Sequence, residues 1–151
     1  RVERQKKMRN MAQDLIQALS PLVEDGKVKI TQSLKGITVE INASVLFSPG
    51  QATLAKNSKI TLQAVAQVVK DHEHEIHVEG HTDNAGGDDY NVDLSYRRAF
   101  AVRKALVQQL SVVENRLSAK GYGEARPVAS NAHDAGRAKN RRVTVVNLGA
   151  R

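Results

Sequence analysis

The sequence predicts an α/β (α+β) two-layer sandwich, in which a mixed β-sheet carries helices on one face and an N-terminal helix comes first. Strand-like segments with alternating apolar residues are separated along the chain by segments whose apolar residues follow helical spacing. The chain has 151 residues, 40% of them hydrophobic, which suits a single core. We therefore expect a linker helix over residues 1–26 and one folded domain over residues 27–151.

The N-terminal segment is first basic and then helical in pattern. Residues 1–9 carry five basic side chains against Glu3, which fits a solvated linker or the start of a helix. Pro21 and Gly26 predict that the helix ends between Ser20 and Asp25. We expect a small domain not to bury Met11, Leu15, Leu19 and Leu22 of this helix fully, which favours a dimer. The whole apolar stripe of the helix consists of Met8, Met11, Leu15, Ile16, Leu19 and Leu22 or Val23.

Two strands should follow, over residues 28–32 and 36–41, because apolar and polar residues alternate in both. The Ser33-Leu34-Lys35-Gly36 segment between them is typical of a hairpin turn. Residues 45–50 should then break regular structure at Pro49-Gly50, with Leu46 and Phe47 holding the loop to the core.

A second helix is expected over residues 58–71, with Ser58 as its N-cap, because apolar residues recur there at helical spacing. A central strand over residues 75–80 precedes a polar, glycine-containing turn and a third helix over residues 91–110. The buried face of that helix should contain Ser95, Ala99, Val102, Leu106 and Leu110, with Arg98 at its edge in the first two turns. A strand over residues 116–120, a helical turn over residues 137–140 and a last strand over residues 142–148 complete the chain.

Composition limits the possible functions. The formal charge of +7 is compatible with nucleic acid, anionic lipid or an acidic polymer as partner and does not choose among them. The chain has no Cys, so disulfides and thiolate catalysis are excluded. It has no run of 18 or more apolar residues that would span a membrane. Because the sequence begins at Arg1, we expect a fragment of a longer protein.

The turn between the central strand and the third helix is the candidate binding site. Where a strand ends in polar residues and a helix follows, the loop between them forms an opening at the end of the sheet, and ligands often bind there. We interpret Asp83 and Arg98 as a pair that holds a small zwitterionic group. Alternatively, Asp83 caps its own turn, Asn91 is only an N-cap, and Arg98 pairs on the surface with Asp89 or Asp93.

Two other clusters of polar residues are possible sites. Four histidines, His72, His74, His77 and His81, lie close together, but their spacing does not match the helical i, i+4 arrangement of zinc sites. The basic residues Arg137, Lys139, Arg141 and Arg142 form either a solvated edge or an anion site. No acid pair, nucleophile elbow or phosphate-binding loop is evident, and the few aromatic residues argue against base stacking with nucleic acid.

Four blocks of the sequence together resemble the OmpA-like peptidoglycan-binding domain, in the right order and with suitable gaps over about residues 36–148. The blocks are Gly80-His81-Thr82-Asp83-Asn84, Tyr90-Asn91-x-x-Leu94-Ser95-x-x-Arg98-Ala99, Gly121-Tyr122-Gly123-Glu124-x-x-Pro127 and Asn140-Arg141-Arg142-Val143.

This resemblance implies an OmpA-like fold and a non-enzymatic domain, without cofactor or metal, that grips the diaminopimelate of the peptidoglycan stem peptide. The aspartate and arginine that contact the ligand in the family fall on Asp83 and Arg98. Neighbouring contacts fall on Thr82, Asn91, Leu94 and Arg141.

Residues 36–41 and 45–52 look most like the MotB/MotD group of flagellar stator subunits, which implies a role in cell motility and chemotaxis. Such a subunit would be a periplasmic homodimer, anchored in the inner membrane by one upstream helix with a buried Asp, and partnered there by a MotA/MotC-type stator subunit. The alternative within the family is a peptidoglycan anchor of an OmpA/Pal-type outer-membrane protein. Alternatives from other classes are a metal hydrolase that uses His77 and His81, and a basic nucleic-acid binder.

Overall fold

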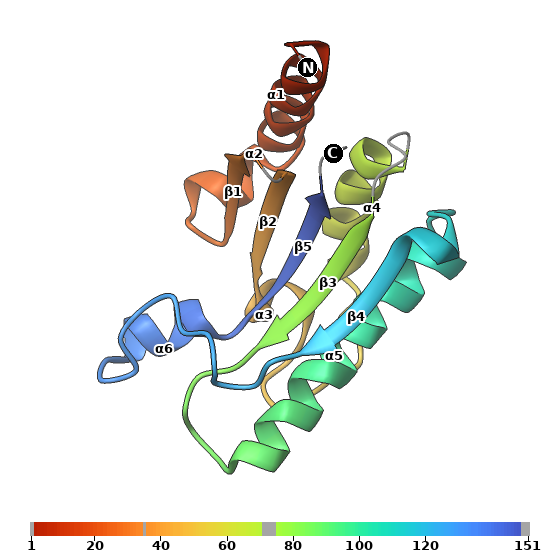
Figure 1. Cartoon of the computed structure of the whole chain (residues 1–151). Helices are drawn as coiled ribbons and strands as arrows, with labels where there is room; N and C mark the ends of the chain where they lie inside the picture. The colour runs from red at the N-terminus through yellow and green to blue at the C-terminus, as the bar shows by residue number, and fades with distance from the viewer. Residues whose placement is uncertain (1, 35, 71–74, 149–151) are drawn as a thin grey trace.

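The computed structural model describes residues 2–34, 36–70 and 75–148, and contains a five-stranded mixed sheet with the order β1-β2-β5-β3-β4 (Figure 1). β1, β2, β5 and β3 pair antiparallel, and β4 pairs parallel to β3. The predicted mixed sheet is therefore confirmed. The strands are β1 (Val28–Ser33), β2 (Gly36–Asn42), β3 (Ile76–His81), β4 (Leu117–Gly121) and β5 (Arg142–Leu148). The helices are α1 (Val2–Ala18), α2 (Ser20–Glu24), α3 (Ala43–Leu46), α4 (Ser58–Val69), α5 (Asp88–Gln108), the 3₁₀ helix η1 (Glu114–Arg116) and α6 (Asp134–Asn140).

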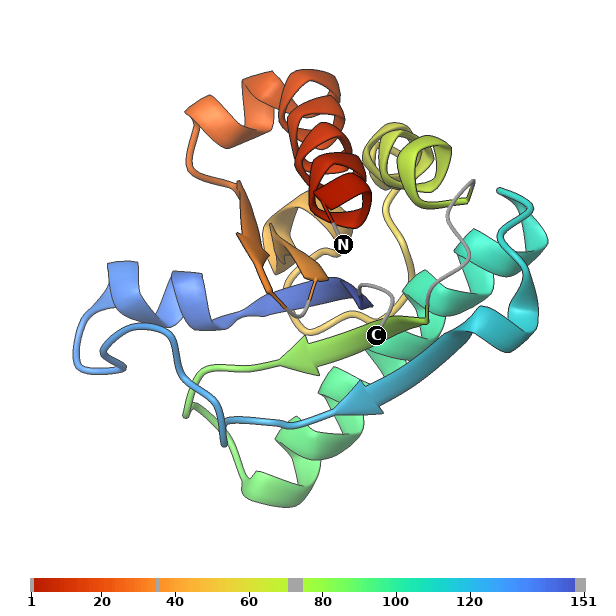
Figure 2. The same cartoon turned by 45° about the horizontal axis from the view of Figure 1, so that its top comes forward.

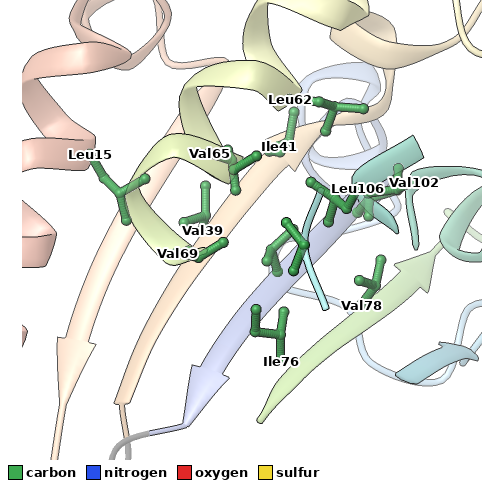
Figure 3. Packing of buried hydrophobic residues seen from close by; sticks show 14 of the residues in the cluster. Leu15, Val39, Ile41, Leu62, Val65, Val69, Ile76, Val78, Val102 and Leu106 are labelled. Carbon is green, nitrogen blue, oxygen red and sulfur yellow. The ribbon is translucent and has the colours of Figure 1, made fainter. Parts of the chain in front are cut away.

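The long helices α1, α4 and α5 form the second layer of the sandwich, on one side of the twisted sheet (Figure 2). Aliphatic side chains fill the space between the layers, because the alternating residues of β2, β3 and β5 point toward the apolar stripes of the helices (Figure 3). Ile41 and Val78 of the sheet and Val65 and Leu106 of the helices are all fully buried. The predicted sandwich with helices on one face is confirmed.

The N-terminal helix belongs to this same core. Met11, Leu15 and Leu19 of the predicted stripe are at most 3% exposed, whereas Ile16 is 43% exposed. The sequence-based argument for a dimer was therefore wrong, because the chain buries most of this stripe against its own α4 and sheet. A homodimer stays a prediction on other grounds.

Two glycines allow α5 to lie unusually close to the sheet. A Cβ on Gly80 of β3 would lie 2.0 Å from the Ser95 carbonyl oxygen, and a Cβ on Gly121 of β4 would lie 2.4 Å from the Tyr96 nitrogen. Neither distance is possible for a real side chain. The close approach brings the first turns of α5 to the carboxyl end of β3, where the polar turn begins.

The structure corrects several element boundaries. Residues 43–46 form the short helix α3, whose last two residues fall in the segment predicted to be irregular. The Asn42 side chain caps it by accepting a hydrogen bond from the Ser44 amide at 3.0 Å. Ser58 is the first residue of α4, and its hydroxyl donates to the Ala55 carbonyl. The last strand, β5, has the predicted bounds. The predicted end of α4 at residue 71, and His72 and His74, lie outside the described residues.

Candidate functional site

A pocket of about 400 Å³ opens where β3 ends and α5 begins, and all six residues predicted for the site line it. These residues are Thr82, Asp83, Asn91, Leu94, Arg98 and Arg141. They come from the turn after β3, from α5 and from the junction of α6 with β5. The structure thus brings together side chains that are far apart in sequence, such as Asp83 and Arg141, which are separated by 58 positions.

Asp83 is the central acceptor of the pocket and is 7% exposed. Its Oδ1 accepts a hydrogen bond from the Ala85 amide at 3.0 Å, which is the turn-capping role considered as the alternative. Its Oδ2 accepts from Arg141 Nη1 at 2.6 Å, across the mouth of the pocket. The turn contact therefore fixes one carboxylate oxygen, while the other faces a side chain that is itself 45% exposed.

Arg98 is 6% exposed and is held by the loop that follows α3. Its Nε donates to the Gln51 carbonyl at 2.8 Å and its Nη2 to the Ser48 carbonyl at 3.4 Å, and its guanidinium lies 5.0 Å from the centre of the Phe47 ring. Burial lowers the pKa of Arg98 from its ordinary value. Among the described residues, Nη1 has no hydrogen-bond acceptor, so donors remain for a ligand.

The position of Arg98 in the helix corrects the sequence analysis. Because α5 begins at Asp88, Arg98 lies in its third turn, roughly 15 Å along the axis from the first residue. The N-terminal amides of α5 therefore do not lie beside its guanidinium. Arg98 also does not pair with Asp93, which instead accepts a hydrogen bond from Arg97 at 2.8 Å on the exposed side of the helix.

Asn91 and Thr82 order the backbone of the mouth. Asn91 is buried in the first turn of α5 and is not the N-cap, a position that Gly87 occupies. Its Nδ2 donates to the Ala85 carbonyl at 2.9 Å and, more weakly, to the Asp83 carbonyl at 3.4 Å. The Thr82 hydroxyl donates to the same Asp83 carbonyl at 2.8 Å. These contacts hold the chain around Asp83 without using its carboxylate.

The opposite wall of the pocket was missed by the sequence analysis. It comes from α3 and the loop after it, and Tyr90 contributes from the start of α5. Phe47 had been assigned only a core role, and it is 3% exposed. The contact between this loop and Arg98 joins residues 47 positions apart, so no local pattern could reveal it. The wall residues are Ala43, Ser44, Phe47, Pro49, Gly50 and Tyr90.

The histidines near the site do not converge. His81 is 3% exposed and stacks on Tyr122 with ring centres 5.4 Å apart. Burial, helped by Arg142 and Arg126, lowers the pKa of His81 to about 3, so the ring is neutral at physiological pH. His77, four residues before His81 on β3, lies 3.7 Å from the Glu75 carboxylate and makes no contact with His81 that would join them in one site. Within the described ranges, no group of three His, Cys, Asp or Glu side chains is placed to hold a metal ion.

The basic residues predicted to form one cluster make separate contacts in the structure. Arg137 pairs with Asp134 inside α6, whereas Arg141 turns to Asp83. Arg142 is 6% exposed and donates to the Arg126 carbonyl at 2.9 Å and to the Asn140 carbonyl at 3.2 Å. Arg141 is therefore the member of the cluster that lines the pocket.

Comparison with known proteins identifies the family of this chain. The sequence profile of the OmpA family matches residues 46–141, which contain the whole pocket except its first wall residues. The chain belongs to the OmpA family. It is 44% identical over 106 residues, 70% of its length, to outer membrane porin F of Pseudomonas aeruginosa. It spans only 30% of that porin's length, and 54% of the length of the probable lipoprotein YiaD of Escherichia coli, to which it is 39% identical.

Two solved structures have the same fold as this chain. A putative MotB-like protein from Desulfovibrio vulgaris superimposes with a TM-score of 0.83 over all of both chains at 26% identity. The cell wall anchor of the type VI secretion system of Pseudomonas aeruginosa superimposes with a TM-score of 0.81 at 27% identity, over 90% of this chain and 97% of that one. Both matches extend well beyond the family profile. In the part of the chain that the structure describes, none of the helices combines the length and apolar character needed to cross a bilayer.

Proposed function

We propose that this domain is a non-catalytic anchor that binds peptidoglycan by gripping the free end of diaminopimelate in the stem peptide. That end carries an ammonium group and a carboxylate on one carbon, so its receptor needs an anion and a cation in one pocket. The observation that carries the proposal is that Asp83 and Arg98 line the same pocket of about 400 Å³. Membership of the OmpA family supports it, as does the likeness to a cell wall anchor.

The contacts of the pocket suggest how the ligand is held. The ammonium group would approach Asp83 Oδ2 and share it with Arg141, whose half-exposed side chain is free to shift. The carboxylate would accept hydrogen bonds from the remaining donors of Arg98. Leu94, which is 6% exposed, and Phe47 would contact the methylene chain.

The direct test is retention by purified peptidoglycan. Asp83→Asn removes the charge that attracts the ammonium group and should weaken binding by about 1.5–3 kcal/mol, the scale of a charge-assisted hydrogen bond. Asp93→Asn is the matched control, because Asp93 is an exposed aspartate paired with Arg97 away from the pocket. Retention of Asp83→Asn equal to that of the control would refute the assignment, provided that both variants melt as folded proteins.

At a finer level, we propose that the anchor belongs to a flagellar stator subunit of the MotB type, a periplasmic homodimer joined to a MotA/MotC-type partner through an inner-membrane helix. The full-length superposition on the MotB-like protein, which includes the N-terminal helix, favours this assignment. The alternative, an OmpA/Pal-type outer-membrane anchor, is favoured by the higher sequence identity to porin F. The gene sequence upstream of residue 1 distinguishes them: a single apolar helix with one buried Asp supports the stator, whereas a β-barrel or a lipidated Cys refutes it.

A further inference from the structure

A second groove, of about 510 Å³, lies along the free edge of the sheet and is separate from the Asp83 pocket. Strand β1 is the last strand of the sheet on this side, and five consecutive residues of the chain, 26–30, line the groove. The helices α1 and α2 contribute to one side, and α6 and the start of β5 to the other. Figure 2 shows α2, β1 and α6 along the same side of the molecule.

The backbone of β1 offers hydrogen bonds along this edge. β1 pairs antiparallel with β2, and the Asn42 amide donates to the Lys27 carbonyl at 2.8 Å. In an antiparallel pair, hydrogen bonds to the partner strand alternate along the chain, so Lys29 also bonds to β2. The amide and carbonyl groups of Val28, Ile30 and Gln32 therefore point away from β2. Val28 is 3% exposed, whereas Ile30 is half-buried and Gln32 is exposed, so the edge is most open at Ile30 and Gln32. An extended chain could use them to add a sixth strand.

The side chains divide into an apolar side and a basic side. On the helix side of the sheet, the groove is lined by Ile16, Val23 and Ile30, and Ile16 is 43% exposed. On the opposite side it is lined by the exposed Lys27, Lys29 and Lys139. The division follows from the alternation of side chains in β1, since odd and even positions face opposite sides.

The charge of the groove is strongly positive. Its described lining contains four basic side chains, the three lysines and Arg142, and one carboxylate, that of Glu40. Glu40 Oε1 lies 3.9 Å from Arg142 Nε, so a buried cation already faces it. The three lysines are left to attract an anionic partner from solution.

We propose that this edge binds an extended segment of a partner protein in which acidic and apolar residues alternate. Paired with β1, such a strand would direct its apolar side chains onto Ile16, Val23 and Ile30 and its carboxylates toward the lysines. A second copy of this chain is disfavoured, because pairing two β1 edges would bring Lys27 and Lys29 against their own equivalents. The partner is therefore acidic and of a different sequence.

The test uses a capped heptapeptide of alternating glutamate and valine, titrated into the ¹⁵N-labelled domain. We expect saturable shifts of the Val28, Ile30 and Gln32 amide signals. A peptide of alternating lysine and valine should not bind, and N-methylation of the backbone of the glutamate–valine peptide should abolish binding because it removes the main-chain donors. Equal binding of the N-methylated peptide, or shifts confined to other surfaces, would overturn the proposal.

Charge reversal at the lysines of the groove is a second test of the proposal. The double variant Lys27→Glu and Lys29→Glu should weaken peptide binding roughly tenfold or more, since it replaces attraction by repulsion at two contacts. Lys56→Glu with Lys59→Glu, at exposed positions before and in the first turn of α4, is the matched control and should bind normally. Both double variants should keep wild-type retention by peptidoglycan, because neither touches the Asp83 pocket. Peptide affinity that is equal in the two double variants would refute the role of the basic edge.

Discussion

Replacement of Arg98 by Lys should weaken both the fold and ligand binding, although it conserves the charge. The Nε hydrogen bond to the Gln51 carbonyl at 2.8 Å is the stronger of the two that hold the guanidinium, and the bond to Ser48 at 3.4 Å is weak. A lysine ammonium group cannot reproduce the planar fork of donors. We expect a loss of about 1.5–3 kcal/mol in the free energy of unfolding, the scale of a hydrogen bond to a charged group. For a domain of this size that corresponds to a decrease in Tm of roughly 3–12 °C.

The affinity of Arg98→Lys for peptidoglycan should decrease by more than its loss of folding stability explains. Loss of a bidentate contact to the carboxylate of diaminopimelate should weaken binding by about 1.5–3 kcal/mol, or roughly ten- to hundredfold. Thermal melts and peptidoglycan retention at 20 °C, where the variant should still be folded, separate the two effects. Arg97→Lys is the control, because Arg97 lies one position earlier and makes a half-exposed pair with Asp93. A wild-type melt for Arg98→Lys would refute the loop contact, and wild-type retention would refute the ligand contact.

Three further predictions concern the fold. Gly80→Ala should destabilise the domain by about 3 kcal/mol or more in chemical denaturation, because its Cβ would collide with the Ser95 carbonyl. Gly87→Ala meets nothing within 4 Å and should cost only about 1 kcal/mol, from the loss of a favourable N-cap residue. Leu15→Ala should cost about 2–5 kcal/mol and keep a single unfolding transition, since Leu15 is fully buried in the common core; a separate transition for α1 would contradict this. His81 has a pKa of about 3 when folded against 6.5 for an exposed histidine, so the unfolded chain binds the extra proton between these values. Stability should therefore fall as pH decreases through that window, by at most about 1.4 kcal/mol per pH unit, and His81→Gln should remove this part of the slope.

Regular elements with strong patterns were predictable from the sequence. The bounds of β5 were predicted to the residue, and those of β3 to within one, because both strands lie in the middle of the sheet and alternate clearly. The start of α5 was placed three residues late because Asn91 resembles an N-cap. In the structure the acidic first turn at Asp88 and Asp89 follows Gly87, and Asn91 bonds backward to the turn.

The contacts inside the site were not predictable from the sequence, because they join residues that are far apart along the chain. Resemblance to the family identified six of the residues that line the pocket, but no local pattern showed that Arg141 reaches Asp83 across 58 positions. The same holds for the loop that grips Arg98, and for α3, whose single turn depends on a cap from Asn42 at the end of β2. Local propensity is weak for such short elements, so packing decides them.

The most direct test of the central claim compares two soluble stem peptides that differ at one position. One carries diaminopimelate and the other carries lysine, which lacks the second carboxylate and so cannot offer the zwitterionic end. Titration of each peptide into the ¹⁵N-labelled domain, with affinities from calorimetry, measures the contribution of that end alone. We predict saturable binding of the diaminopimelate peptide with shifts around Asp83 and Arg98, and binding of the lysine peptide at least roughly tenfold weaker. Equal affinity for the two peptides, or shifts away from this pocket, would contradict it.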